Sequence, residues 1–470
     1  MRSSDLRKAF RGVDWSVATA DALASPDAMP WRPAASGPAR QWSLDLAAVV
    51  GEVSPSPQVI VGWPHLQPEG PGSWDSEALD RCDRRLDQLL EQGLRPGLTL
   101  LHVDMPAWVD ASDGWLNRDT AVRFADFAAV AAEHFGDRVH RWTTVSDLLV
   151  HSIADYVAGM LPTGRGVGMR GLVALHHVLL GAGLATRAVK NADDGAEVGT
   201  AMTLVGGYAA TDDLADRVAL SQMEYWAYRL FLDPLLLGQH MADENDRSPV
   251  EETGCVKDGD MAVISASLDE LGLVWHVPTR VAAPENLPRL LPVRQCFSAL
   301  NDANRVLAPL GFVLAPMEAV KTTAYGWPIV PEGLADAVAA LYEIYGDALP
   351  PLRVVDNGMC DLGAADALDD DRERRSALTA QLTWLAQVMA EGVQVRGYEY
   401  WSLADNAAWK LGYTRHYAMA ADAGLYPPQP RIPSDWVHQD AFGGRVGFGV
   451  GTPGVRGKRT LHPVQTARRP

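Results

Sequence analysis

The first 145 residues alternate between short β-branched runs and amphipathic stretches, and this alternation is the strongest constraint on the fold. Within residues 76–92 the apolar side chains recur with the 3.6-residue period of a helix, and Gly93 ends the stretch. We expect strands at 13–19, 58–63, 97–103 and 139–145, and helices at 76–92 and 120–135. Strands that alternate with helices at this spacing form βα units and a parallel sheet.

The rest of the chain continues this pattern with longer helices. We expect helices at 41–50, 170–190, 212–236, 331–345 and 372–391, strands at 261–267, 352–356 and 395–401, a loop at 24–40, and an irregular segment with a short helix at 301–313. The sequence has no internal repeat or linker, and 470 residues suit one α/β barrel. We therefore predict a single (β/α)8 TIM barrel with long βα loops over residues 1–444, followed by a basic tail at 445–470 that wraps the surface or is disordered.

Composition excludes several classes of partner. The chain carries 59 acidic against 41 basic residues and a net charge of −18, which argues against nucleic acid. Its four cysteines are far apart and form no CxxC motif, so we expect no zinc site, no disulfide framework and a reducing, cytoplasmic compartment. The first residues lack the apolar core of a signal peptide, and no apolar run is long enough to span a membrane. We expect a small-molecule substrate, either a glycoside or an apolar ring-containing metabolite, no cofactor or metal, and a possible homo-oligomer.

Two aspartates stand at the carboxyl ends of predicted strands. Asp147 follows the strand at 139–145, and Asp356 ends the strand at 352–356. In a parallel barrel the active site is built at this end of the strands. A pair of carboxyl groups is also what glycoside cleavage needs, one to protonate the leaving oxygen and one to stabilise or attack the sugar. The alternative is two unrelated aspartates that cap helices or form salt bridges.

Seven stretches carry a resemblance to a known family, and they occur in the family's order. They are TLLHVDMPAW (99–108), GWLNR (114–118), FGDRVHRWTTVSD (135–147), FLDPLLLG (231–238), YGWPIVPEGL (325–334), VVDNG (354–358) and VRGYEYWSLADNAAWKLGY (395–413). From about residue 10 to 425 the chain resembles glycoside hydrolase family 1, the β-glucosidase and β-galactosidase family. The resemblance implies a (β/α)8 barrel, in agreement with the pattern of strands and helices.

The resemblance also places the catalytic pair, with both residues changed. The family's acid/base lies in a T-F-N-E-P-like stretch that matches Thr144 to Leu148, where Ser146 replaces Asn and Asp147 replaces Glu. The family's nucleophile lies in a T-E-N-G-like stretch, where Asp356 replaces Glu. The resemblance therefore assigns catalysis to Asp147 and Asp356.

Most of the family's sugar-binding groups are replaced as well. Leu23 matches a sugar-binding Gln, Gln58 an Arg beside the nucleophile, Ala266 a Tyr that bonds the nucleophile, and Ala408 a Glu that binds sugar hydroxyls. The sugar site retains His102, Trp401 and Trp409. Each lost partner removes roughly 1–3 kcal/mol of paired hydrogen bonding. The replacements predict a wider, more apolar floor that suits a deoxysugar, an aglycone or a polyketide-like ring.

The shorter aspartates should also change the chemistry. Retaining sites hold their carboxyl groups about 5–5.5 Å apart and inverting sites about 6.5–9.5 Å, and two Glu-to-Asp replacements widen the gap. Without the Arg and Tyr donors, the pKa of Asp356 should rise. The pair would then work as proton donor and acceptor better than as acid and nucleophile.

The sequence indicates a functional role less strongly for several other polar residues. Glu399 shares a strand face with Trp401 and is interpreted as a salt-bridge partner of Arg396 or of another barrel group, with a third catalytic acid as the alternative. His151 could tune Asp147 or lie on the surface. We expect His65, Asp104 and Asp405 to be structural.

Three functions remain open. The first is a divergent glycosidase that acts on a β-linked, modified or deoxygenated sugar conjugate through Asp147 and Asp356. The second is a barrel recruited to another acid/base reaction, such as a cyclisation, elimination or isomerisation. The third is an inactive binding protein, which the retained carboxylates disfavour.

Overall fold

The centre of the molecule is an eight-stranded parallel sheet. The computed structural model describes residues 6, 8–17, 56–102, 104–159, 165–241, 248–287, 298–317, 320–323, 326–359, 367–401, 420–421 and 429–430. The strands are β1 (Asp14–Val17), β2 (Gln58–Ile60), β3 (Gly97–Leu101), β4 (Arg141–Val145), β5 (Glu197–Thr203), β7 (Glu270–Val274), β10 (Leu352–Asn357) and β11 (Val395–Tyr400). Their order, β1-β11-β10-β7-β5-β4-β3-β2, follows the chain around a ring. The fold is therefore a (β/α)8 TIM barrel, as predicted.

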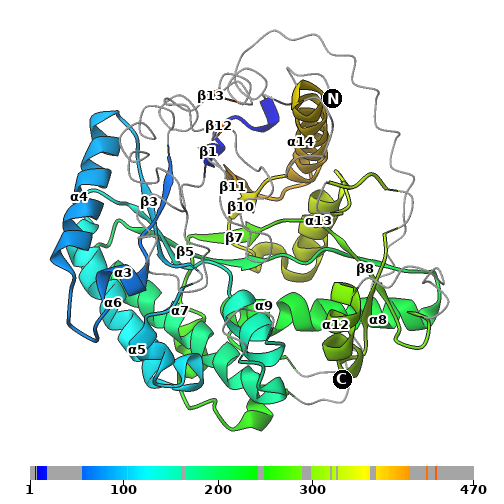
Figure 1. Ribbon diagram of the computed structural model, residues 1–470, viewed down its shortest axis with the longest axis horizontal. Helices are drawn as coiled ribbons and strands as arrows, with labels where there is room; N and C mark the ends of the chain where they lie inside the picture. Colours follow the sequence, from blue (N-terminus) through cyan, green and yellow to red (C-terminus); the bar gives the residue numbers. More distant parts are fainter. Residues whose placement is uncertain are drawn as a thin grey trace.

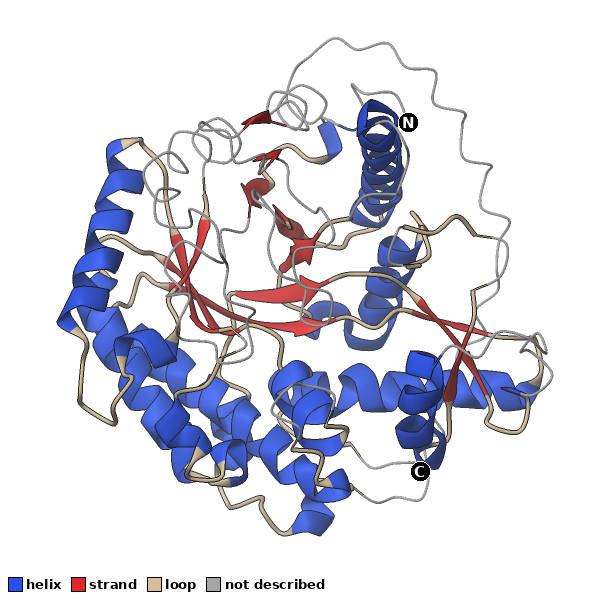
Figure 2. Ribbon diagram, in the orientation of Figure 1, coloured by secondary structure: helices blue, strands red, loops and turns tan. Residues whose placement is uncertain are grey.

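Helices surround this sheet, as the blue ribbons around the red strands show in Figure 2. They are α3 (Trp63–Leu66), α4 (Ser76–Glu91), α5 (Ala107–Asp110), α6 (Asp119–Phe135), α7 (Leu172–Ala192), α8 (Leu214–Glu224), α9 (Leu230–Leu232), α10 (Asp260–Ile264), α12 (Ser298–Leu307), α13 (Gly333–Tyr345) and α14 (Ala367–Ala390). In Figure 1, α4, α6 and α7 cover one side of the barrel, and α13 and α14 cover the side of β10 and β11. A smaller sheet of β6 (Gly207–Ala209), β8 (Thr279–Ala282) and β9 (Val313–Ala315) extends from the barrel, and β12 (Ala420–Ala421) pairs with β13 (Gln429–Pro430).

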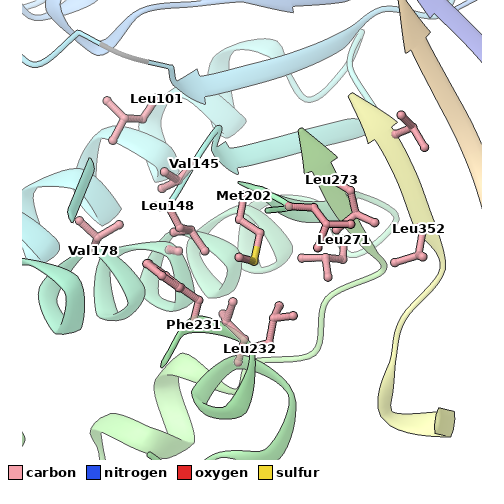
Figure 3. Close-up of a cluster of buried hydrophobic side chains, with 14 of the residues drawn as sticks. Leu101, Val145, Leu148, Val178, Met202, Phe231, Leu232, Leu271, Leu273 and Leu352 are labelled. Atoms are coloured by element: carbon pink, nitrogen blue, oxygen red, sulfur yellow. The ribbon is translucent and has the colours of Figure 1, made fainter. Parts of the chain in front are cut away.

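The apolar core fills the space between the strands and the helices. Figure 3 shows Met202 of β5 and Leu271 and Leu273 of β7 facing Phe231 and Leu232 of α9. All five side chains are at most 1% exposed. At about 25 cal/mol per Å² of buried apolar surface, this layer is the main force that holds the helices on the sheet.

The barrel interior contains charged residues near the amino ends of the strands. We call Asp14, Gln58, Arg141, Glu270 and Arg353 the charged layer. Arg141 donates to Asp14 at 2.5 Å and to Gln58 at 2.9 Å. Arg353 lies 3.1 Å from Asp14 and donates to Glu270 at 2.9 Å. Because both arginines are almost fully buried, this layer fixes strands β1, β2, β4, β7 and β10 to one another.

The strand predicted at 261–267 is wrong. Residues Asp260–Ile264 form helix α10, which begins after Gly259 at a φ of 87°. The left-handed Gly259 begins the helix, and the carboxylate of Asp260 accepts the Lys257 N–H of the preceding turn at 2.9 Å. The strands in this half of the barrel are β5 and β7, and the sequence pattern predicted neither.

Smaller differences concern the helices. The helix predicted at 212–236 is interrupted by π-helical turns at Tyr225–Arg229 and Asp233–Leu237, where Pro234 cannot donate a backbone N–H. The segment predicted to be irregular contains α12 and β9. The helix at 41–50, the loop at 24–40 and the tail at 445–470 lie outside the described residues, so the boundary at residue 444 stays a prediction.

One helix, Gly168–Ala192, is long and apolar enough to cross a membrane. Within the protein, 78% of its most apolar window is buried, as in a core helix. Its buried face carries His176 and His177. His176 lies 3.3 Å from His240 and 2.8 Å from Asp260, and His177 contacts the Trp115 carbonyl at 2.9 Å.

Acid should destabilise the fold through these histidines. Burial lowers the pKa of His177 and of His240 to about 4, whereas an unfolded histidine titrates near pH 6.5. The unfolded chain therefore binds more protons between those values, and stability should fall as the pH drops from about 6.5 to 4, by about 3 kcal/mol per residue at the limit. Urea unfolding at pH 7 and pH 5 measures this loss. The His177→Gln/His240→Gln variant should show a shallower pH dependence, and an unchanged slope in that variant would contradict the assignment.

Candidate active site

Asp147 lies directly beyond the end of β4 and is anchored to the end of β5. Its carboxylate accepts the backbone N–H and the hydroxyl of Thr203 at 3.0 and 2.6 Å, and the N–H of Val150 at 3.4 Å. The Asp147 N–H donates to the Ala201 carbonyl at 3.0 Å. The neighbouring Ser146 is buried, and its N–H donates to the Leu101 carbonyl.

Asp356 lies in a bulge at the end of β10. Val354 pairs with Tyr398 and Asn357 pairs with Tyr400, so β10 has one residue more than β11 in this interval. A bulge bends its strand and can re-aim a side chain beside an active site. Asp147 and Asp356 both have left-handed backbones, with φ of 72° and 51°. This conformation costs a residue other than glycine about 1–3 kcal/mol and is concentrated at functional sites.

Glu399 lies in the barrel next to Asp356. Its carboxylate accepts the Asp356 backbone N–H and, at 3.3 Å, the hydroxyl of Ser16. Of the two salt-bridge partners predicted for Glu399, Arg396 is wrong, because it is exposed whereas Glu399 is 3% exposed. Instead, the positive charges of Arg141 and Arg353 act on Glu399 from the charged layer.

The two neighbouring acids raise each other's proton affinity. The pKa of Asp356 lies well above its usual value, first because protein surrounds the side chain, then because of the negative charges of Glu399 and Asp147. The pKa of Glu399 is also raised by burial, although Arg141 and Arg353 oppose the shift. The site therefore combines Asp147, which accepts hydrogen bonds from three donors, with Asp356, whose pKa is raised.

Replacement of Glu399 tests this coupling. Glu399→Gln keeps an acceptor for the Asp356 N–H but removes the negative charge, so we expect the pKa of Asp356 to fall toward its usual value. The carboxyl ¹³C signal of Asp356, assigned by its loss in Asp356→Asn, measures the titration directly. An unchanged Asp356 pKa in the folded variant would show that Glu399 has no electrostatic role.

Two residues assigned by resemblance lie elsewhere. Gln58 is the first residue of β2, and its amide bonds Thr99 and Arg141 in the charged layer rather than Asp356. Ala266 lies between α10 and β7. It precedes its strand, whereas Asp147 and Asp356 lie at strand carboxyl ends, so Ala266 belongs to the opposite end of the barrel. The missed strand β7 caused this misplacement, and the segment at its carboxyl end is 274–276.

His102 and Trp401 lie at the carboxyl ends of β3 and β11. Their rings are nearly parallel, with an angle of 15° and centroids 6.2 Å apart. His151, for which a surface position was one prediction, is buried and contacts the His102 carbonyl through Nε2. Burial lowers the pKa of His151, so its neutral ring holds His102 in place. Leu23, Ala408, Trp409 and Asp405 lie outside the described residues.

The close approach of β10 and β11 explains the glycine of the VVDNG stretch. A Cβ on Gly358 would lie 1.7 Å from the Trp401 carbonyl oxygen, and the Trp401 N–H donates to the Asn357 carbonyl at 3.2 Å. Only glycine permits this backbone contact. It holds Trp401 next to the loop that follows Asp356.

A pocket that is partly open to solvent lies beside this loop. The rings of His276 and Trp327 line it, and neither residue was predicted from the sequence to belong to the site. The rings of His276 and Trp327 lie 5.7 Å apart. The run Leu271–Gly272–Leu273–Val274 ahead of these residues could have been read as a strand, which would have placed Trp275 and His276 at the active-site end.

Comparison with known proteins agrees with this architecture. Residues 40–424 match the family described as glycosyl hydrolase family 1. The chain belongs to this family. It is 31% identical over 387 residues to a bifunctional β-D-glucosidase/β-D-fucosidase of Bifidobacterium breve, covering 80% of each protein. It is 28% identical to β-glucosidase A of Thermotoga maritima, covering 84% of this chain and 83% of the relative.

Solved structures of the family share the fold. A psychrophilic β-glucosidase from Micrococcus antarcticus superposes with a TM-score of 0.80 at 26% identity, covering 95% of this chain and all of the other. The family prediction is thereby confirmed.

Proposed function

We propose that this family 1 protein cleaves the glycosidic bond of a sparsely hydroxylated sugar conjugate by proton transfer, without a covalent intermediate. One observation carries the proposal: the two strand-end carboxyl groups have opposite environments. Asp147 accepts hydrogen bonds from three donors, whereas burial and the charge of Glu399 raise the pKa of Asp356. A nucleophile must be ionised, so Asp356 is better suited to donate a proton than to attack.

The proposed reaction is an inverting hydrolysis. Asp356 gives its proton to the glycosidic oxygen as the bond to the anomeric carbon breaks, and Asp147 takes a proton from the water that attacks the opposite face. The alcohol leaves and the sugar configuration inverts. For a β-linked substrate bound as in the family, the donor is Asp147 and the acceptor Asp356. The raised pKa of Asp356 makes it the poorer acceptor in that assignment.

The proposed substrate class follows from the groups around Asp356. Within the described part of the chain, no arginine or lysine forms an ion pair with Asp356, and Gln58 is committed to the charged layer. Few polar groups therefore remain to bind sugar hydroxyls. A deoxysugar conjugate would leave fewer hydroxyl groups without partners than glucose would.

A panel of aryl glycosides tests the proposal. It should contain α and β anomers of glucose, fucose and 2-deoxyglucose, with wild type, Asp356→Asn and Asp147→Asn as enzymes. We expect release from deoxygenated members, its loss in both variants, and an inverted first product by NMR. A retained configuration, or a glycosyl adduct found by mass spectrometry, would overturn the mechanism.

A second candidate is a non-hydrolytic acid/base reaction on a ring-shaped metabolite. The observation that favours it is the wall of the pocket, where Trp327, Pro328, Ile329 and Pro331 present mainly apolar surface. The same donor and acceptor would move a proton between two positions of one substrate. Absence of release from every folded enzyme and substrate in the panel would favour this candidate over hydrolysis.

A further inference from the structure

His276 stands between the two strand ends that carry the acids. It follows β7, in which Val274 pairs with Thr203 of β5 and with Val355 of β10. Thr203 binds the Asp147 carboxylate, and Val355 directly precedes Asp356. The register therefore brings His276, two residues beyond Val274, to the rim between Asp147 and Asp356.

The imidazole of His276 faces open space on this rim. Its side chain is exposed to the cavity, whereas the preceding Trp275 is 1% exposed and packed in the core. Trp327 forms the facing wall, with 44° between the two rings. No described residue forms a hydrogen bond with the imidazole.

The other polar groups of the cavity already have partners. Asn357 donates to the Trp275 carbonyl at 3.0 Å and accepts from Gln381 at 2.8 Å. The Thr323 hydroxyl accepts the Trp327 N–H at 3.3 Å. His276 is therefore the polar group best placed to bind a molecule that enters.

We propose that His276 is a specificity-determining residue that binds a hydroxyl or carbonyl substituent of a flat ring lying against Trp327. This proposal rests on the proposed function in that the ring is taken to be part of the substrate. The neutral imidazole offers one hydrogen-bond donor and one acceptor to such a substituent.

Binding of two matched probes tests the proposal without turnover. 2-Naphthol and naphthalene differ by one hydroxyl group, and calorimetry at pH 7 gives their affinities. We expect wild type to bind 2-naphthol about tenfold more tightly, which corresponds to about 1.4 kcal/mol, as one neutral hydrogen bond would give. Equal affinities for the two probes would overturn the proposal.

Variants separate the hydrogen bond from the shape of the cavity. His276→Phe keeps an aromatic ring and should lose the preference for 2-naphthol, whereas His276→Gln should keep most of it. In wild type the preference should weaken at acidic pH as the imidazole is protonated, and His276→Gln should remove this dependence. If folded His276→Phe still prefers 2-naphthol to naphthalene, another group of the protein binds the naphthol hydroxyl, which would contradict the proposal.

The proposed function can fail independently of this inference. Arg138→Met, a change at the surface, should bind both probes as wild type does. If wild type prefers 2-naphthol to naphthalene but releases no aryl alcohol from any glycoside, only the hydrolytic proposal is refuted. If wild type hydrolyses a glycoside but binds the two probes equally, only the role of His276 is refuted.

Discussion

Asp356→Asn is expected to lower turnover of the best substrate by about 10²–10⁴-fold while leaving the fold intact, because general acid catalysis contributes about that much. Asparagine is close in shape to a protonated aspartate and tolerates the left-handed backbone that this position requires. Unlike an ionised aspartate, the amide also places no negative charge beside Glu399. Stability should therefore be unchanged or slightly higher. Turnover and thermal unfolding of the same preparation check both expectations.

Asp147→Asn is the matched control, since it replaces the other acid by its amide. In the wild type, the N–H and the hydroxyl of Thr203 both donate to the carboxylate. The NH2 group of the amide is itself a donor, so it would face one of these two donors and could not accept its hydrogen bond. Loss of these hydrogen bonds should cost about 1–3 kcal/mol of stability in addition to activity. The two variants thus differ in stability even where both are inactive. An Asp356→Asn enzyme that keeps more than about a tenth of wild-type turnover would rule out Asp356 as the proton donor.

The barrel could be predicted because its early strands are regular. Their β-branched runs alternate with helices of clear 3.6-residue period, and the family stretches follow in order. Strands β5 and β7 escaped prediction because the tight barrel interior requires small side chains there. A Cβ on Gly199 would lie 2.7 Å from the Glu270 carbonyl oxygen, and one on Gly272 would lie 2.5 Å from the Cβ of Ala201. These glycines weaken the strand signal that the pattern depends on.

Part of the candidate site, too, could be predicted from the sequence and part could not. Asp147 and Asp356 could be placed from sequence because a residue that follows a parallel strand lies at the active-site end. Their left-handed backbones and the bulge depend on pairing between strands 40 or more residues apart, which local sequence does not specify. Ala266 was misplaced because its strand was missed, and His276 was overlooked for the same reason. The alternation that placed Glu399 on the face of Trp401 predicted its inward position but not its contact with Asp356.

Arg353→Met is expected to destabilise the protein by about 3–5 kcal/mol, because it removes this cation from the buried Glu270 and from Asp14, which is half-buried and keeps Arg141. Arg353 is 5% exposed and holds β10 to β1 and β7 through these two carboxylates. Urea unfolding followed by circular dichroism measures the free energy of unfolding. The variant should also lower activity, since β10 carries Asp356 at its end.

Arg138→Met provides the control at the surface. Arg138 pairs with Asp83 and Asp87, which are 27% and 56% exposed at their side chains, so solvent can replace the lost contacts. Its loss should cost no more than about 1 kcal/mol. The double variant Arg353→Met/Glu270→Gln should recover part of the stability lost in Arg353→Met, because it removes the buried charge that has lost its cation. A similar loss in Arg353→Met and Arg138→Met would mean that the charged layer does not hold the barrel strands together, and that Asp356 is positioned by the packing of β10 alone.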